Sequence, residues 1–314
     1  MGKVVVIGAG QWGKNLVKSF DELGALAGVA EASSVLRNSL AEQYTHIPFF
    51  EDYREALSIA DAFVIATPAH THAPIAKELI LAGKDVFVEK PITLSVNDAE
   101  ELIILAETNK CILMVGHLLL HQPAIHKIKE IIESGKIGSL KSLHQERLKL
   151  GRVRSVENVF WSFGVHDLAV FLYLVGEPPK QITVAGQAIL QNGIEDDVYV
   201  HLGFENDITA HLHTSWLWPQ MKRGLTVIGT EGMIVYDEET QAVTLHQKRI
   251  SESLANIDEG TIEVCKGSDR PLTLECKHFL ECIESRQTPL SDGNNGLEVV
   301  RILEQVTKLM KGEH

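Results

Sequence analysis

The sequence predicts an α/β fold with two domains, on three observations. The chain has 314 residues, which suits two domains at roughly 150 residues each. In its first third, short apolar runs alternate with helical segments, as in a doubly wound parallel sheet. After about residue 120, polar and apolar residues alternate strictly, which indicates a mostly antiparallel sheet covered on one face. We place the domains at residues 1–120 and 121–314.

The first domain is expected to contain buried parallel strands separated by helices. The strands are predicted by nearly continuous apolar runs at residues 3–8, 60–67, 85–89 and 111–116. The first helix ends at Gly24, and the next clear one has Pro74 in its first turn and ends at Gly83. A further helix begins at Ser95, which precedes an apolar helical pattern.

The second domain is expected to open with a helix over residues 121–134 and to continue as strands. The clearest strands form a hairpin, with alternating apolar residues from Val198 to Phe204 and from Ile208 to Leu212. Two helices near 271–286 and 296–311 close the chain, and the last of them could pack back on the first domain.

Composition excludes several classes of function. The 29 Lys and Arg residues against 42 Asp and Glu give a net charge of −13, which would repel nucleic acid. The longest apolar runs, such as 168–175, fall far short of the ~20 residues that cross a bilayer. An apolar, strand-like pattern begins at Val4, so we expect no signal peptide. The four cysteines do not have the spacing of a disulfide framework or a metal site. We expect a cytoplasmic protein with reduced thiols and no membrane partner.

A glycine-rich loop predicts a dinucleotide site. Gly8, Gly10 and Gly13, with Gln11 and Trp12 between them, directly follow the first strand and open the first helix. Glycines at this spacing allow a tight turn, close approach of a pyrophosphate and close packing of helix on strand. Glycines are common in such turns, but the position after a strand favours a dinucleotide-binding Rossmann domain.

Glu31 ends the second strand-like stretch, where an acidic side chain can accept hydrogen bonds from ribose hydroxyls. The alternative is an ordinary surface glutamate. No arginine immediately follows Glu31, and Arg37 is expected on the next helix. A 2′-phosphate would meet a negative charge, so we predict NAD in preference to NADP.

Two further strand ends should line the same crevice, because ligands bind at the carboxyl ends of parallel strands. Thr67 and Pro68 follow one strand, with His72 just beyond, and Glu89 and Lys90 end another. The lysine could bind a substrate hydroxyl or act in proton transfer, or it could be a solvated residue before a proline turn. His117, after the last strand of this domain, could also reach the crevice.

The second domain carries a candidate base and a group of cations. His166 lies in the first turn of a predicted helix, where it is either a general base or a partly buried polar residue. The cations Arg147, Lys149, Arg152 and Arg154 precede it and suit a diphosphate or a solvated strand edge. Phe160 and Trp161 could stack on a flat base or sugar.

Three histidines are expected on one face of the hairpin. The apolar register pairs His201 with His211 and places His213 diagonally on the same face. Such a face could bind Zn²⁺, but it is more often an interface or a solvated surface. We therefore predict no metal site.

Together these residues resemble the Gfo/Idh/MocA family of nicotinamide-dependent oxidoreductases, over nearly the whole chain. The resemblance rests on the glycine loop, Glu31, Thr67-Pro68, Glu89-Lys90-Pro91, Gly116-His117, residues 164–167 and Asp292-Gly293. It implies NAD as cofactor and Lys90 and His166 as catalytic residues, with a Lys–Pro bond that is often cis. It also implies homodimers or homotetramers that pair through the open sheet face. Many members carry Asp four residues before the histidine, where this chain has Ser162.

Residues 147–167 further resemble a branch thought to oxidise UDP-N-acetyl sugars at C3, ahead of an aminotransferase. The implied substrate is UDP-N-acetylglucosamine, oxidised to its 3-keto sugar. A polyol or inositol dehydrogenase and a non-catalytic NAD-binding sensor remain as alternatives. The residues expected to contact the nucleotide sugar are Lys90, His117, Arg147, Arg152, Arg154, Trp161 and His166.

Overall fold

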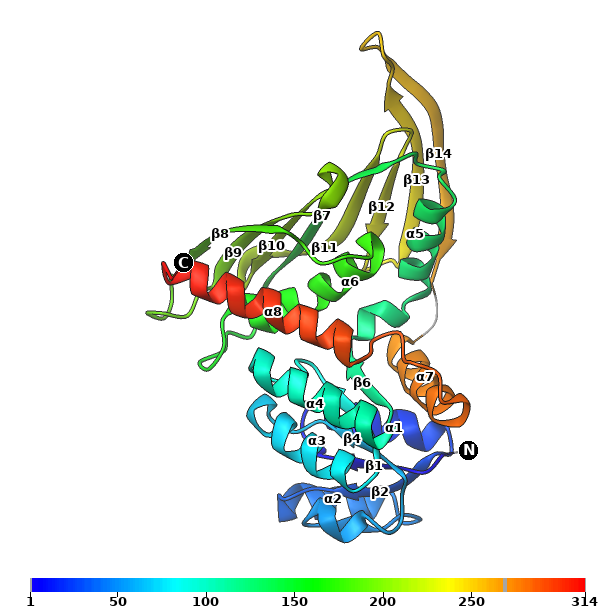
Figure 1. Ribbon diagram of the computed structural model, residues 1–314, viewed down its shortest axis with the longest axis vertical. Helices are drawn as coiled ribbons and strands as arrows, with labels where there is room; N and C mark the ends of the chain where they lie inside the picture. The colour runs from blue at the N-terminus through cyan, green and yellow to red at the C-terminus, as the bar shows by residue number, and fades with distance from the viewer. Residues whose placement is uncertain (1, 268–269, 314) are drawn as a thin grey trace. The chain divides into compact units, whose positions relative to one another are not determined.

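The computed structural model describes residues 2–267 and 270–313, and the chain divides into two compact units. The first unit combines Met1–Leu118 with Arg270–Arg301, and the second combines Leu119–Asp269 with Ile302–His314. Figure 1 shows the elements of both units. In the described part of the chain, no helix is long and apolar enough to cross a membrane.

The first unit is a doubly wound α/β domain. Its six strands are all parallel, in the order β3-β2-β1-β4-β5-β6. The strands are β1 (Val4–Ile7), β2 (Leu26–Ala30), β3 (Phe49–Phe50), β4 (Ala62–Ile65), β5 (Asp85–Glu89) and β6 (Leu113–Gly116). The helices are α1 (Gly13–Glu22), α2 (Ser34–Gln43), α3 (His72–Leu81), α4 (Val96–Asn109) and α7 (Pro271–Ser285). The predicted Rossmann fold is confirmed.

Helix α7 comes late in the sequence but completes the core of the first unit. It packs with α1, and the ring of Phe279 lies 5.5 Å from that of Phe87 on β5 in an edge-to-face contact. Arg286, just after α7, donates to Asp85 with an Nη1–Oδ2 distance of 2.6 Å. The first unit is therefore assembled from both ends of the chain.

The second unit is built on an open sheet of eight strands, in the order β14-β13-β12-β11-β7-β10-β9-β8. All neighbours are antiparallel except β10 and β7, which run parallel. The strands are β7 (Leu140–Leu150), β8 (Gln181–Gln187), β9 (Asp197–Gly203), β10 (Thr209–Ser215), β11 (Leu217–Gly229), β12 (Met233–Asp237), β13 (Ala242–Ile250) and β14 (Asn256–Lys266). This confirms the predicted, mostly antiparallel sheet.

Helices α5 (Pro123–Glu133) and α6 (Val165–Val175) belong to this unit, and α8 (Gly293–Met310) is shared between the two units at Arg301. In Figure 1, α5 and α6 lie along one face of the sheet. The hairpin β9–β10 has the predicted register, with His201 opposite His211. Val198, Val200 and Leu202 are buried, whereas Tyr199 and His201 are exposed.

Candidate functional site

The glycine loop between β1 and α1 has the geometry of a phosphate cradle. Gly8 has a φ of +86°, which favours glycine, and a Cβ at Gly13 would collide with the carbonyl oxygen of Gly8. A Cβ at Gly10 would meet no described atom within 4 Å, so this side of the loop is open to a ligand. Gln11 and Trp12 are exposed at the turn. The backbone N–H groups at the start of α1 can bind a pyrophosphate in that space.

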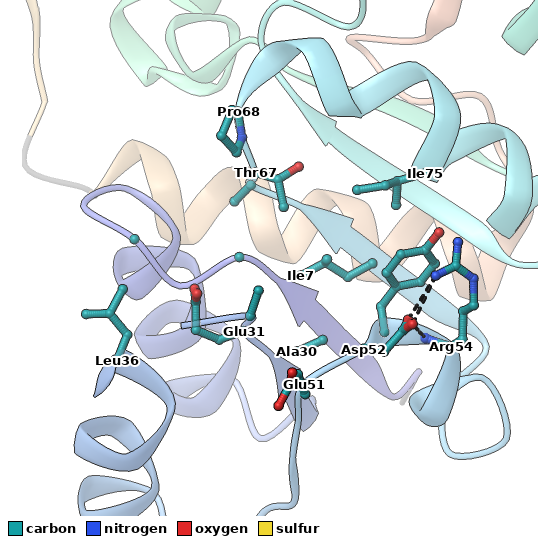
Figure 2. A pocket seen from close by; sticks show the side chains of 15 residues that line it. Ile7, Ala30, Glu31, Leu36, Glu51, Asp52, Arg54, Thr67, Pro68 and Ile75 are labelled. Carbon is teal, nitrogen blue, oxygen red and sulfur yellow. Dashed lines mark hydrogen bonds and ion pairs between the residues drawn. The ribbon is translucent and has the colours of Figure 1, made fainter. Parts of the chain in front are cut away.

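A cavity of about 580 Å³ lies beside the loop. Five predicted cofactor residues line it: Gly8, Gly10, Glu31, Thr67 and Pro68. Figure 2 shows Thr67 and Pro68 on one side of this cavity and Glu31 and Glu51 on the other. The carboxyl ends of β1, β2 and β4 therefore meet at one crevice, as the sheet topology requires.

One side of this cavity is formed by residues that the sequence did not single out. Glu51, Asp52, Tyr53 and Arg54 also line it, and they directly follow β3. Because β3 has only two residues, Phe49–Phe50, it gives no periodic pattern that would reveal a strand end. The only local sign of this strand end is the Phe-Phe pair followed directly by two acidic residues.

Glu31 is held in place by the backbone around the cavity. Its Oε2 accepts from the N–H of Ala9 at 2.7 Å, and its Oε1 accepts from the N–H of Ser33 at 2.8 Å. Arg37, on α2, donates to the backbone carbonyl of Glu31 at 2.6 Å and to the Glu51 carboxylate at 2.8 Å. A negative charge is thus fixed at the cavity, while the neighbouring cation is already paired.

The end of β5 places Glu89 and Lys90 beside the glycine loop. The indole Nε1 of Trp12 donates to Glu89, and the N–H of Lys90 donates to the same carboxyl group at 3.2 Å. Burial raises the pKa of Glu89 to about 7, although its hydrogen bonds and the charge of Lys90 oppose the shift. The Lys90–Pro91 peptide bond is cis, as the resemblance implies. Glu89 and Trp12 thus join the glycine loop to the strand end that carries Lys90.

His117 lies at the end of the neighbouring strand β6 and is only 1% exposed. Burial lowers its pKa to about 3, and the positive charge of Lys90 adds to the shift. Within the described residues, neither ring nitrogen has a hydrogen-bond partner. A neutral imidazole with unused polar atoms near Lys90 fits a ligand-contacting role.

His72 has a different environment from the cofactor contact that the sequence suggested. It is buried, and its ring nitrogens lie 2.8 Å from the carbonyl oxygens of Thr67 and Pro91. Burial lowers its pKa despite these two contacts. The imidazole therefore bridges two strand-end loops, because its ring nitrogens face two protein carbonyls, and a direct contact with the cofactor stays a prediction.

In the second unit, His166 lies in the first turn of α6, directly after a π-helical turn at Phe160–Gly164. The side chain of Asn158 holds this turn: its Oδ1 accepts from the N–H of Trp161 at 3.1 Å, and its Nδ2 donates to Glu195 at 2.8 Å. The indole of Trp161 donates to Thr307 at 2.9 Å. π-helical turns are frequent at functional sites, and this one sets the entry into α6.

The four predicted cations have different environments in the structure. Arg152 and Arg154 are exposed, and Arg154 lies 3.7 Å from Glu157. Lys149 lies over the ring of Phe163 at 5.6 Å. Partial burial lowers the pKa of Lys149, and the positive charges of two neighbouring arginines lower it further. Arg147 does not fit the expected diphosphate role: it is buried, and its guanidinium donates to Asp167 and Glu238. Its charge is already matched inside the protein.

Among the described residues, no group of three or more His, Cys, Asp or Glu side chains could hold a metal ion. On the open face of the sheet, the Nδ1 atoms of His201 and His211 are 2.6 Å apart. His213 is instead stacked on Tyr199 and contacts Asp197. The three histidines thus share a face but make separate contacts.

Comparison with known proteins identifies the family. Residues 2–117 match the model described as "Oxidoreductase family, NAD-binding Rossmann fold", and residues 125–235 match the "GFO/IDH/MocA C-terminal domain". The chain belongs to the Gfo/Idh/MocA family of oxidoreductases. Both halves of the family architecture are thus present in one chain.

Relatives within the Gfo/Idh/MocA family differ in substrate. UDP-N-acetylglucosamine 3-dehydrogenase of Acidithiobacillus ferrooxidans is 24% identical over 96% of this chain and 95% of its own. Inositol 2-dehydrogenase of Rhizobium meliloti is also 24% identical, with the same coverage of both chains. A solved structure of the A. ferrooxidans enzyme matches with a TM-score of 0.89 at 24% identity, covering 99% of this chain and 98% of that one. This match shows a common fold.

The cofactor of this Gfo/Idh/MocA member is NAD, bound by its Rossmann domain. The structure fits that cofactor: the open side of Gly10 can receive a pyrophosphate, and the fixed Glu31 carboxylate can accept from ribose hydroxyls. Thr67 and Pro68 supply the opposite wall of the cavity.

Proposed function

We propose that this protein oxidises the 3-hydroxyl of a UDP-N-acetyl sugar, UDP-N-acetylglucosamine, to the 3-keto sugar with NAD. The observation that carries the proposal is the pair of exposed cations, Arg152 and Arg154, on the segment that leads to α6 and His166. Guanidinium groups suit a diphosphate, whereas a bare polyol offers them no charge. The full-length similarity to UDP-N-acetylglucosamine 3-dehydrogenase supports the same substrate.

In this proposal, the loop from Gly8 to Gly13 holds the cofactor diphosphate and Glu31 holds the adenosine ribose. When bound, NAD accepts the hydride from the carbinol carbon. Trp161 contributes its half-buried ring face to the nucleotide sugar, because its N–H already donates to Thr307.

We assign proton transfer to His166 and Lys90. His166 removes the proton from the reacting hydroxyl, since histidine is the side chain that titrates near neutral pH. Lys90 donates a hydrogen bond to the same oxygen and stabilises the developing alkoxide. His117, neutral and close to Lys90, contributes a further polar contact to the substrate. The reverse assignment, with Lys90 as the base, is the alternative.

Variants of the two residues test this assignment. We expect Lys90→Met and His166→Asn each to lower turnover about a hundredfold or more, because each removes a group that acts on the reacting oxygen. Turnover is followed as absorbance of reduced nicotinamide. Lys141→Met and His46→Asn, which change exposed residues of the same types, are the matched controls. Near-full turnover in both active-site variants would show that the assignment is wrong.

The substrate is tested with a panel of UDP-N-acetylglucosamine, its C6-oxidised uronic form, free N-acetylglucosamine and myo-inositol. We expect NAD reduction with a UDP-sugar and little with the free sugar or inositol. Activity on inositol alone would favour the inositol dehydrogenase alternative, which the Rhizobium meliloti relative supports. NAD binding without turnover on any substrate would favour the sensor alternative.

A further inference from the structure

A cluster of four charged side chains, buried or partly buried, lies in the second unit and includes Asp167, the residue that follows His166. Arg147, on β7, donates to Asp167 through Nε at 2.8 Å and through Nη2 at 2.8 Å. On its other side it donates to Glu238, at 2.7 Å from Nη2 and 3.2 Å from Nη1. Arg223, on β11, donates to the same Glu238 at 3.3 Å. The Arg147 and Asp167 side chains are only 6% and 1% exposed.

Within these four side chains, two guanidinium groups face two carboxylates, so their charges balance. The positive charges of Arg223 and Arg147 also act on Lys149 and help to lower its pKa. Burial raises the pKa of Asp167, while the charge and hydrogen bonds of Arg147 oppose that shift. Removing one member would leave an unmatched charge in the protein interior, where charge interactions are strong.

Asp167 connects this cluster to the candidate base. It directly follows His166 in the first turn of α6, and both of its carboxylate oxygens accept from Arg147. A two-pronged arginine contact fixes the plane of a carboxylate as well as its distance. The start of α6, and with it the backbone of His166, is therefore tied to strand β7 at the middle of the sheet.

We propose that Arg147 and Asp167 are positioning residues for His166, which hold the first turn of α6 on the sheet and set the net charge at that turn. This inference rests on the proposed role of His166 in proton removal. It gives Arg147 a function different from substrate binding, which is consistent with a guanidinium that is buried and already paired on two sides.

Four variants distinguish the positioning of His166 from the effect of the net charge of the cluster. Arg147→Met leaves a net negative cluster, Asp167→Asn leaves a net positive one, and the double variant is balanced again. Arg147→Lys keeps the charge but loses the two-pronged contact. Lys222→Gln, which changes an exposed cation on β11, is the control and should behave as the unmodified protein. Each is measured for kcat and KM with the UDP-sugar, for the pH profile of kcat/KM, and for folding by circular dichroism.

We expect the acid limb of the kcat/KM profile to move in opposite directions in the two single variants, by about one pH unit or less. Excess negative charge in Arg147→Met favours the protonated base and moves the limb to higher pH. Excess positive charge in Asp167→Asn moves it to lower pH. In the double variant and in Arg147→Lys the limb should return to its original position, while kcat stays roughly tenfold or more below the unmodified protein because His166 is misplaced.

Two outcomes would overturn the inference. One is a raised KM with unchanged kcat in Arg147→Met, as a substrate-binding arginine would give. The other is a limb that stays in place, or moves the same way, in both single variants. If the single variants fail to fold, the double variant and Arg147→Lys decide: normal kcat in both contradicts the inference, and lowered kcat with an unshifted limb supports it. Full turnover of His166→Asn would instead remove the role of His166 on which this inference rests, whereas no turnover of a UDP-sugar by the unmodified protein would remove the proposed function itself.

Discussion

Cofactor choice depends on single residues at the edge of the cavity. Glu31 is fixed by two backbone N–H groups, so its charge cannot easily move away from a bound ribose. Arg37, the cation that could receive a 2′-phosphate, donates instead to Glu51 and to the carbonyl of Glu31. Both features favour NAD.

We predict that the double variant Glu31→Ser, Glu51→Gln shifts the preference toward NADP. It removes the repulsive carboxylate and releases the Nη2 group of Arg37 from its ion pair for a phosphate, which together should change the ratio of the two kcat/KM values by about a hundredfold or more. The comparison uses steady-state kinetics with each cofactor. Glu42→Gln, on the same helix as Arg37, is the control. An unmodified protein that used NAD and NADP equally would contradict the premise.

Among single residues, the sequence predicted those whose roles follow from their position at a strand end. Gly8, Gly10 and Glu31 follow from their places at strand ends, and the structure puts them at one cavity. The burial of Arg147 was not predictable, because its partners Asp167 and Glu238 lie 20 and 91 residues away. The contact of His72 with the Pro91 carbonyl was not predictable for the same reason, since the two residues are 19 positions apart.

Among the helices and strands, α7 carries an acidic side chain that is unusual for a protein core. Glu275 faces the core of the first unit and is fully buried, and among the described residues neither of its carboxyl oxygens has a hydrogen-bond partner. Burial raises its pKa well above 4.5, and the negative charge of Glu89 adds to the shift. At pH values between the unfolded and the folded pKa, the folded state therefore keeps a proton on Glu275 that the unfolded chain releases.

We predict that Glu275→Gln stabilises the protein at alkaline pH. Because the folded pKa is above the unfolded value, the unmodified protein loses stability as the pH rises from about 4.5 through the folded pKa. Glutamine does not titrate, so the Tm difference should grow with pH and reach about 2–4 °C or more at pH 8. Thermal unfolding between pH 5 and 8 measures it. Glu281→Gln, exposed on the same helix, should show no such trend, and a constant difference in Glu275→Gln would contradict the explanation.

The elements that the sequence predicted best are those with strong local patterns. The run 85–89 coincides with β5, and the apolar register of the hairpin gave the His201–His211 pair. The parallel pairing of β10 with β7 has no such signal, because Thr209 lies opposite Ser142, 67 residues earlier in the chain. Order in a sheet is decided by contacts of this range, which periodicity does not report.

For the whole molecule, we predict a homodimer or homotetramer that pairs through the open face of the eight-stranded sheet. This face carries polar and aromatic side chains, among them Tyr199, His201 and His211. Light scattering at assay concentration should give a multiple of the 34.7 kDa chain mass. Tyr199→Glu should weaken the assembly, because it places charges opposite their own copies; Val35→Glu, at an exposed residue of α2, is the control. A monomer would contradict the prediction.

Helix α7 belongs to the first unit but is synthesised after the strands of the second unit, and this order affects how the nascent chain folds. While the ribosome is still translating the second unit, Phe87 and Asp85 have no Phe279 and no Arg286 to contact. At 5–20 residues per second, the delay between residues 85 and 286 is roughly 10–40 s. Over that time the nascent nucleotide-binding domain exposes apolar core, so we expect a ribosome-stalled chain ending at residue 267 to bind chaperones and to gain NAD affinity only when residues 270–301 are also synthesised.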